Sequence, residues 1–367
     1  MVKIGAATLS EFVREIFAKS GCSAVESERI GKYLVSANLT GHDSHGVARV
    51  PRYLQWKNDG VVIADQKVEI LRETPVLAVL DGRHGFGQTV GPQAVAIGIE
   101  KCKGMGLSLV ALRNSGHIGR IGDWAEMAAD AGLVSVHFVN ASGSVLVAPF
   151  GGSERRLSTA PFAVGVPRPG QSPIILDFAT SVVAEGKVLV ASQGGKALPA
   201  GALIDSDGRM SADPRVLYGD YTATGLRQGG KGTGAIRAFG EHKGSGLALM
   251  CELLGGSLTG MKATGSEGAA QDRFRGNGML SFYVDPKVVD PEHIFPADVA
   301  RYVAYFKSAK PAVAGGEVLI PGEPEERTRQ QRLRDGVPLP DDTWASIIEA
   351  ARAVGVSERR IQSLSAA

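Results

Sequence analysis

The chain has 367 residues, of which 44% are hydrophobic and 21% charged, and its formal net charge is +2. This is the composition of an ordinary globular protein, with enough chain for one large or two moderate domains. The small net charge and the scattered basic residues argue against nucleic-acid binding. The sequence has no run of about 18 apolar residues and no apolar leader segment, so we expect no membrane segment. Its widely spaced cysteines, Cys22, Cys102 and Cys251, suit a reducing compartment, and we expect a cytoplasmic protein.

Helices are predicted at the N-terminal end of the chain. Thr8 and Glu11 have the spacing of a capping box, as do Ser23 and Glu26, and apolar residues follow each pair at helical intervals. Pro51 suits the first turn of a third helix.

The middle of the chain alternates between β-branched runs and helical stretches, which predicts a sheet between helical termini that pack on each other. The expected strands are 76–82, 107–112, 133–139, 162–167, 173–179 and 279–285. The expected helices are 91–103, 120–131, 182–192 and 244–257. Residues 193 to 240 are rich in Gly, Pro, Asp and Ser and are predicted as long loops, and helices return from about residue 296.

The segment "VLAVLDGRHGFGQTVG" has the outline of a dinucleotide-binding strand, turn and helix. Its glycines, Gly85, Gly87 and Gly91, are one residue off the G-x-G-x-x-G spacing. No strand ending in an acidic residue follows about 20 residues later. We therefore predict a turn with a tight strand–helix contact, and no Rossmann fold.

The segment "TGHDSHGVARVPRY" concentrates polar side chains in the turn after the second predicted helix. His45 is suited to proton transfer near neutral pH, and Arg49 would lie on the same side of a helical turn. Because an arginine grips a carboxylate at two points, this pair suits a 2-hydroxy or 2-keto acid. Two other interpretations stay open: His42 and His45 as a metal pair, and Asp43 as a helix cap beside solvated histidines.

A second histidine lies in "NSGHIGRIGDWAEMAADAG", where a strand is followed by a helix. At the N-terminus of that helix, the dipole would keep His117 neutral, so that the imidazole accepts a proton or stacks on a ring. An ordinary polar turn residue is the alternative.

Further candidate segments come later in the chain. In "IILDFATSVVAEGK", Asp177, Thr180 and Ser181 close a strand and would cap a helix whose exposed N–H groups suit an anion. Lys243 precedes a glycine-rich helix and suits a phosphate or ribose. The turn 321–323 leads into a charged helix, which a solvated surface explains equally well.

Taken together, the chain resembles the malate/L-lactate dehydrogenase family that is unrelated to the Rossmann dehydrogenases. The resemblance covers nearly the whole chain and is specific, because six segments occur in the same order. They are "GHDSHGVARVPRY", "SGHIGRIGDWAEMAADAG", "VAPFGG", "LDFATSVVAEGK", "EHKGSGLALMCELLGG" and "LIPGE". Within that family, which includes ureidoglycolate, sulfolactate and diketogulonate oxidoreductases, it looks closest to the hydroxycarboxylate dehydrogenase B group, which uses NAD and 2-hydroxy acids such as aryl-lactates.

The resemblance implies an α/β (α+β) fold of the non-Rossmann, sulfolactate-dehydrogenase-like type. A mainly antiparallel sheet, 73–295, would bind the nicotinamide cofactor. Residues 1–72 with 296–367 would form a helical domain from both termini. A homodimer with the cleft near the subunit interface is implied as well. We expect NAD, with NADP as the alternative, because no arginine pocket for a 2′-phosphate is apparent.

Carried over residue by residue, the resemblance assigns proton transfer to His45 or His117 and places Ser44 and Arg49 in the substrate site. The implied cofactor contacts, besides His117, are Asn140, Ser142, Asp177, Phe178, Ala179, Thr180, Ser181, His242, Lys243, Pro321, Gly322 and Glu323. No metal site is expected. Ala160 departs from the family, which has an asparagine there, and this puts the exact substrate in question.

These residues predict reversible hydride transfer between NAD(H) and a 2-hydroxy acid of the malate, lactate or aryl-lactate type. Arg49 would hold the carboxylate and His45 would move the proton, with Ser44 and Asp43 orienting its ring. The alternatives are an NADPH-dependent reductase of a cyclic imino acid or diketo sugar acid, a metal-dependent hydrolase, and an inactive dinucleotide-binding protein of the same fold.

Overall fold

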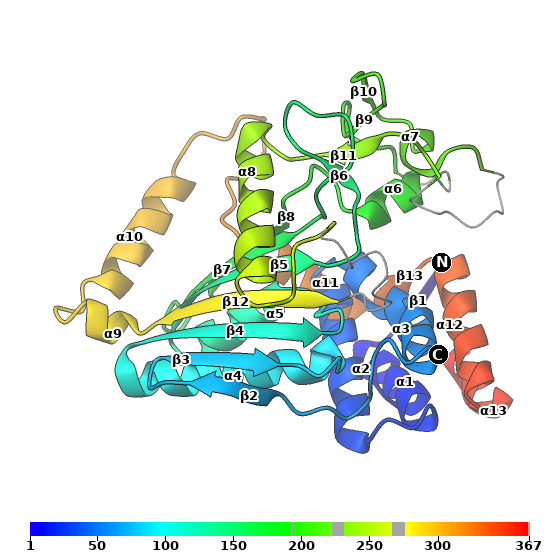
Figure 1. Cartoon of the computed structure of the whole chain (residues 1–367), viewed down its shortest axis with the longest axis horizontal. Coiled ribbons are helices and arrows are strands. Elements are labelled where there is room, and N and C mark those ends of the chain that lie inside the picture. Colours follow the sequence, from blue (N-terminus) through cyan, green and yellow to red (C-terminus); the bar gives the residue numbers. More distant parts are fainter. Residues whose placement is uncertain (193, 195, 222–230, 266–275, 366–367) are drawn as a thin grey trace.

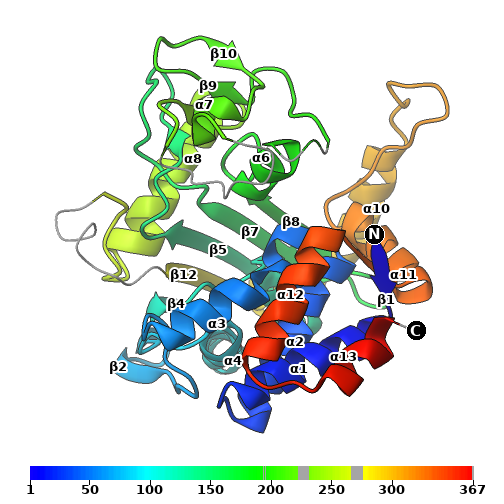
Figure 2. The ribbon, with the colours of Figure 1, turned by 90° about the vertical axis from the view of Figure 1, so that its right-hand side faces the viewer.

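The computed structural model describes the chain except for residues 193, 195, 222–230, 266–275 and 366–367 (Figure 1). Helices from both ends of the chain form one layer (Figure 2). They are α1 (Ala6–Lys19), α2 (Ala24–Leu39), α3 (Val50–Asn58), α12 (Asp341–Ala353) and α13 (Glu358–Ser365). The expected contact between the termini is confirmed, because the core of this layer joins Phe12, Ile16 and Trp344, and β1 (Val2–Ile4) pairs with β13 (Val337–Leu339).

The starts of these helices test the expected caps. Ser23 caps α2, since its hydroxyl accepts a hydrogen bond from the Glu26 amide at 3.2 Å. Pro51 lies in the first turn of α3, as expected. The cap at Thr8 was wrong: α1 begins at Ala6, because two good helix formers extend the helix ahead of the threonine.

A seven-stranded sheet in the order β2-β3-β4-β12-β5-β7-β8 forms the centre of the molecule. Its strands are β2 (Glu69–Glu73), β3 (Leu77–Asp81), β4 (Leu107–Ser115), β5 (Val134–Ala141), β7 (Pro161–Val166), β8 (Ile174–Ala179) and β12 (Asn277–Val284). Neighbouring strands are antiparallel except β3 and β4. The six expected strands are confirmed. The sequence did not reveal β2, because this edge strand is exposed along its whole length and carries no buried face.

Two helices, α4 (Gly87–Met105) and α5 (Gly122–Asp130), pack on one face of this sheet around a core that includes Trp124. The glycines after β3 make the predicted tight contact. A Cβ at Gly87 would lie 2.4 Å from the carbonyl oxygen of His117, and one at Gly91 would lie 2.9 Å from the Trp124 ring. The absence of side chains here lets α4 approach the loop that carries His117.

A smaller sheet, ordered β10-β9-β11-β6, lies beyond β8. It consists of β6 (Val147–Ala148), β9 (Leu203–Ile204), β10 (Met210–Ser211) and β11 (Ala235–Arg237), accompanied by α6 (Glu185–Ser192), α7 (Arg215–Tyr218) and α8 (His242–Met250), which continues as the π-helical segment η3 (Cys251–Ser257). The prediction of long loops with little regular structure over 193–240 is confirmed where the structure describes them, because the regular elements there are only the short β9, β10, α7 and β11. Strands of two or three residues are too short to leave an alternating pattern.

The chain then forms α9 (Pro286–Val289), α10 (Phe295–Lys307) and α11 (Glu323–Asp335). Figure 1 shows α10 standing away from the sheet, whereas α11 lies against α2. The fold is therefore mixed α/β with mainly antiparallel sheets, as expected. Among the described residues, we find no helix that is both long and apolar enough to span a membrane.

Candidate active site

The polar segment after α2 forms two short 3-10 turns, η1 (Asp43–His45) and η2 (Val47–Arg49). The single helical turn that we expected was wrong, because Gly46 between them is extended. A Cβ at Gly46 would lie 2.2 Å from the side-chain oxygen of Asn38. That oxygen accepts a hydrogen bond from the Val47 amide at 2.8 Å, so Asn38 shapes the turn.

Ser44 connects the two side chains that we expected to act together. Its hydroxyl lies 3.1 Å from Nδ1 of His45, and its carbonyl oxygen accepts a hydrogen bond from Nε of Arg49 at 2.6 Å. Asp43 does not contact the His45 ring. Its carboxylate pairs with Arg332 at 2.6 Å and accepts a hydrogen bond from Asn38, which makes it a support of the turn. No capping hydrogen bond from an Asp43 side chain is present at this turn.

His117 lies on the loop after β4 and stacks against His45. The ring centroids are 5.5 Å apart and the planes differ by 13°. On its other side, Nδ1 of His117 lies 2.6 Å from the hydroxyl of Tyr53, a buried residue of α3. The structure thus brings together two histidines that lie far apart in the sequence.

Both imidazoles are neutral at neutral pH. Burial, together with the nearby charges of Arg49 and Arg120, lowers the pKa of His45 to about 3. Burial and Arg49 likewise hold the pKa of His117 well below its usual range. The helix dipole that we expected to act on His117 is not the cause, because α5 begins only at Gly122. Neutral imidazoles can accept a proton directly.

The segment after β8 lies against this pair. A Cβ at Gly186 would come within 2.8 Å of the Ser44 side chain. Asp177 accepts a hydrogen bond from the Gly122 amide at 2.8 Å. The expected helix caps at Thr180 and Ser181 were wrong, because α6 begins at Glu185. Their hydroxyls instead donate to backbone carbonyls of the loop, which fixes its path.

Arg120 is a site residue that the sequence did not reveal. Its side chain is fully buried, and its Nη1 donates to Asp123 at 3.1 Å and to Glu126 at 2.8 Å, while Nε lies 3.6 Å from Asp177. Within the described part of the chain, Nε and Nη2 have no hydrogen-bond partner. Buried donors without partners are costly, so a ligand oxygen beside Asp177 would fit them. Only the arginine in an otherwise apolar helix start could have signalled this.

The other expected cofactor residues flank β8. At one end, the ring centroids of Phe178 and Phe239 are 5.2 Å apart. Phe239 lies three residues before His242, which with Lys243 forms the exposed start of α8. At the other end, Pro321 accepts a hydrogen bond from the Ile175 amide at 3.4 Å. A strand of six residues spans about 17 Å, so the two groups of residues lie about that far apart along β8.

Within that turn, Gly322 packs against Ile175 and Glu323 binds Lys307. A cavity of about 370 Å³ opens beside the start of α8, with Gly151, Arg237 and Glu241 in its lining.

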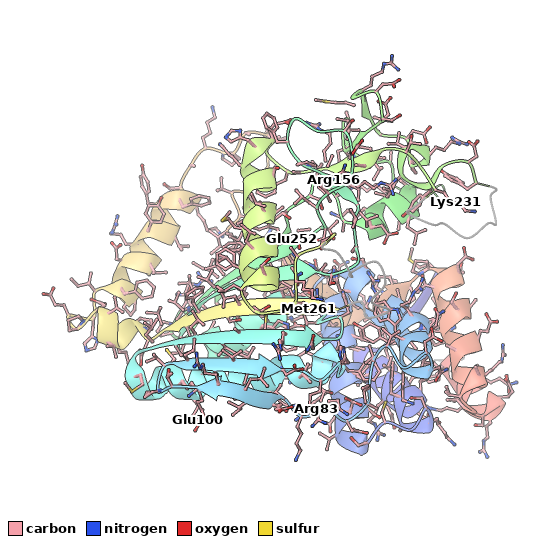
Figure 3. All side chains as sticks on the ribbon, in the orientation of Figure 1. Arg83, Glu100, Arg156, Lys231, Glu252 and Met261 are labelled. Carbon is pink, nitrogen blue, oxygen red and sulfur yellow. The ribbon has the colours of Figure 1, made fainter. Side chains whose placement is uncertain are left out.

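Asn140 lies near the end of β5, two strands from β8, and Ser142 follows that strand. The buried amide of Asn140 donates to Lys262 at 3.0 Å and accepts from the Gly278 amide at 2.8 Å, while the Ser142 backbone bonds Gly276. Glu252, in the π-helical segment η3 that continues α8, lies near Met261 and β12 (Figure 3). The amide of Asn140 therefore already has protein partners, and a cofactor contact of Asn140 or Ser142 stays a prediction.

Ala160, the departure from the family pattern, is fully buried. Its carbonyl oxygen accepts hydrogen bonds from the Thr180 amide at 3.0 Å and from the Thr180 hydroxyl at 2.7 Å. The residue that differs thus lies directly against the expected nicotinamide segment.

The metal alternative needs His42 and His45 as a pair of ligands, but His42 faces Glu325. Its Nε2 lies 3.8 Å from Glu325 of α11. Across the described residues, no group of three or more histidine, cysteine, aspartate or glutamate side chains is arranged to hold a metal ion.

Comparison with known proteins agrees with this fold. The family model for malate/L-lactate dehydrogenase matches residues 4–348. Hydroxycarboxylate dehydrogenase B of Escherichia coli O157:H7 is 38% identical over 98% of this chain and 97% of its own. The solved structure of a candidate malate/lactate dehydrogenase from Escherichia coli has a TM-score of 0.90 at 36% identity, covering 99% of this chain and 98% of that one. Sulfolactate dehydrogenase from Methanocaldococcus jannaschii has a TM-score of 0.83 at 29% identity, covering 97% and 98%.

The fold and these matches thus define an NAD(P)-dependent oxidoreductase that acts on the CH–OH group of 2-hydroxy acids. The chain belongs to the malate/L-lactate dehydrogenase family.

Proposed function

We propose that the chain catalyses reversible hydride transfer between NAD(H) and a 2-hydroxy or 2-keto acid of the malate, lactate or aryl-lactate type. The observation that carries the proposal is the stacked pair of His45 and His117, 5.5 Å apart, with Arg49 bonded to the same Ser44 that contacts His45. The preference for NAD, the homodimer, and the domain division into 1–72 with 296–367 and 73–295 belong to the same proposal.

The residues divide the chemistry between them. Arg49 binds the substrate carboxylate through its terminal guanidinium nitrogens, while its Nε stays on Ser44. Neutral His45 takes the hydroxyl proton at Nε2 during oxidation and returns it during reduction, with Ser44 holding Nδ1. The bound nicotinamide supplies or accepts the hydride at the C2 carbon of the substrate.

The cofactor would lie along β8. The segment from Asp177 to Ser181 would hold the nicotinamide end, with the free nitrogens of Arg120 as donors. His242, Lys243 and the turn 321–323 would hold the rest. The half-buried ring of Phe178, flanked by Phe162 at 5.9 Å, offers an apolar surface to a planar ring.

The test follows the absorbance of NADH and NADPH with pyruvate, oxaloacetate, phenylpyruvate and a cyclic imino acid. We expect turnover of a 2-keto acid with NADH, and its loss in the His45→Ala variant. The second candidate is an NADPH-dependent reductase of a cyclic imino or diketo sugar acid, which Ala160 favours because it changes the wall beside Thr180. Turnover of the imino acid alone would support that candidate, and no turnover of any compound would overturn both.

A further inference from the structure

A chain of two buried groups, the Tyr53 hydroxyl and the Gln88 amide, runs away from the active site behind His117. The Tyr53 hydroxyl lies 2.6 Å from Nδ1 of His117, and Nε2 of Gln88 lies 3.0 Å from the same hydroxyl. Gln88 sits at the start of α4, and both Tyr53 and Gln88 are 1% exposed. Neither of them faces the ring of His45, so neither is placed to touch the substrate.

The direction of these hydrogen bonds follows from one carbonyl group. Nε2 of Gln88 also lies 3.3 Å from the backbone oxygen of His117. Because a carbonyl oxygen only accepts, the Gln88 atom that faces it must be the NH₂ group and not the amide oxygen. The same NH₂ group then donates its second hydrogen to the oxygen of Tyr53.

Tyr53 therefore has its own single proton left to give. Two acceptors lie near it: Nδ1 of His117 at 2.6 Å and the backbone oxygen of His117 at 3.4 Å. The shorter bond is much the stronger one. Burial raises the pKa of Tyr53 to about 12, so the residue keeps this proton at neutral pH.

We propose that Gln88, acting through Tyr53, holds His117 as the neutral tautomer with its proton on Nε2, so that His117 donates a hydrogen bond to the oxygen on C2 of the substrate. In the described structure, Nε2 of His117 has no hydrogen-bond partner, which leaves it free for a ligand. This inference rests on the proposed function and gives the two histidines different roles in it. His45 moves the proton, and His117 polarises the carbonyl and stabilises the oxyanion. Tyr53 and Gln88 are positioning residues.

The decisive variant is Gln88→Glu, which reverses the direction of the two hydrogen bonds that link Gln88, Tyr53 and His117. We call this pair of hydrogen bonds the relay. A carboxylate can only accept, so it takes the Tyr53 proton, and the Tyr53 oxygen then accepts a hydrogen bond from Nδ1–H of His117. The proton leaves Nε2 and the ring edge that faces the substrate becomes an acceptor. Gln88→Met is the matched variant, which removes the donor without supplying an acceptor. Tyr53 can then either donate to Nδ1 of His117 or accept from it, so the two tautomers should mix.

The measurement is ¹⁵N NMR of protein labelled in its histidine rings, without substrate. The chain has 7 histidines, so the His117 signals are identified by their loss in His117→Gln. We expect a protonated Nε2 and a bare Nδ1 in the wild type, the opposite pattern in Gln88→Glu, and a mixture of the two tautomers in Gln88→Met. A wild-type His117 with its proton on Nδ1, or an unchanged pattern in Gln88→Glu, would overturn the proposal.

Kinetics supply a second readout. Loss of the Nε2 donor in Gln88→Glu should lower kcat by about 10²-fold, as for other oxyanion donors, with little change in KM. If Gln88→Glu does not fold, Tyr53→Phe replaces it. This variant should leave Nδ1 of His117 without its partner, and a mixture of tautomers is then expected, whereas a wild-type pattern would overturn the relay. Because the NMR needs no substrate, failure of the relay and failure of the proposed reaction give different results.

Discussion

His45 and His117 differ from ordinary surface histidines in that burial and Arg49 both oppose their protonation. The free enzyme thus holds two neutral imidazoles face to face, with one guanidinium beside them. A substrate carboxylate would bring the negative charge that this pocket lacks.

Replacement of His45 by alanine should lower kcat for 2-hydroxy acid oxidation by about 10²- to 10⁴-fold, because the proton then has no general base. Binding of NADH, measured by fluorescence titration, should change little. His42→Ala is the matched control, since His42 faces Glu325, and it should keep its turnover. Wild-type turnover in His45→Ala would exclude His45 as the proton carrier.

Arg49→Lys should raise the KM for the keto acid by about 10-fold or more. A lysine retains the charge but lacks the planar fork that binds a carboxylate at two points. The comparison is Arg52→Lys, an exposed arginine of the same helix region, which should leave KM unchanged. Equal KM values in the two variants would place the carboxylate elsewhere, with Arg120 as the next candidate.

The pH profile of oxidation follows from the same geometry. A general base must be neutral, and the lowered pKa of His45, about 3, keeps it neutral throughout the range above that value. The kcat/KM for a 2-hydroxy acid should therefore show no acid limb near pH ~6.5, the ordinary pKa of histidine. An acid limb at that pH, with a substrate that does not titrate there, would contradict the burial of His45.

The sequence could predict some of these residues and not others. His45 and Arg49 stand in a short polar segment, and their types alone suggested proton transfer and carboxylate binding. Tyr53 ends that segment, but it has the features of an ordinary helix residue. Gln88 lies among glycines that we explained by a turn and a tight strand–helix contact, so the glutamine itself carried no signal. Arg120 binds carboxylates from two other elements, and only the fold brings them together.

At the scale of elements, the reactive turn depends on Asn38 at the end of α2. Its side chain bonds both the Val47 amide and the Asp43 carboxylate, so it joins η1 to η2. Helix signals at Ser23 and Pro51 located α2 and α3 in the sequence, whereas the 3-10 turns between them result from this one tertiary side chain. Local propensity does not encode such a contact.

Asn38→Ala should lower the free energy of unfolding by about 2 kcal/mol, because it leaves the buried Val47 amide without a partner. The turnover should fall too, because Ser44 and Arg49 lie in the turns that Asn38 holds in place. Urea denaturation measures the first effect and steady-state assays the second. Asn58→Ala, at the exposed end of α3, is the control and should stay within about 0.5 kcal/mol of the wild type. A variant as stable as that control would show that Asn38 does not hold the turn.

At the scale of the whole molecule, the stability should respond to acid through His137 of β5. The ring is fully buried between the hydroxyls of Ser135 and Ser281, and burial lowers its pKa to about 3. The unfolded chain takes up a proton near pH ~6.5, and the folded chain does not until the lower value. The stabilisation is therefore complete above the unfolded pKa and is lost as the pH falls towards 3, at about 1.4 kcal/mol per pH unit.

The measurement is urea denaturation over a series of pH values from neutral to mildly acid. His137→Gln should flatten the pH dependence by about one proton, since glutamine keeps the hydrogen bonds but does not titrate. His293→Gln, at an exposed position, should leave the slope as it is. Equal slopes in His137→Gln and the wild type would contradict this account.

The overall arrangement was partly accessible from the sequence. Strong β-branched runs located six strands, and the expectation of a mainly antiparallel sheet came from the family resemblance and not from periodicity. The order of the strands was not predicted. The short strands β6, β9, β10 and β11 left no readable pattern, because two or three residues do not complete an alternation.

The bond between Arg332 and Asp43 has a consequence for synthesis. Arg332 also donates to the Asn38 carbonyl, so a side chain almost 300 positions downstream braces the loop that carries His45. A nascent chain that has emerged only as far as the large sheet already contains His45 and His117, yet lacks this brace. Competence for catalysis would therefore arise only after α11 has left the ribosome.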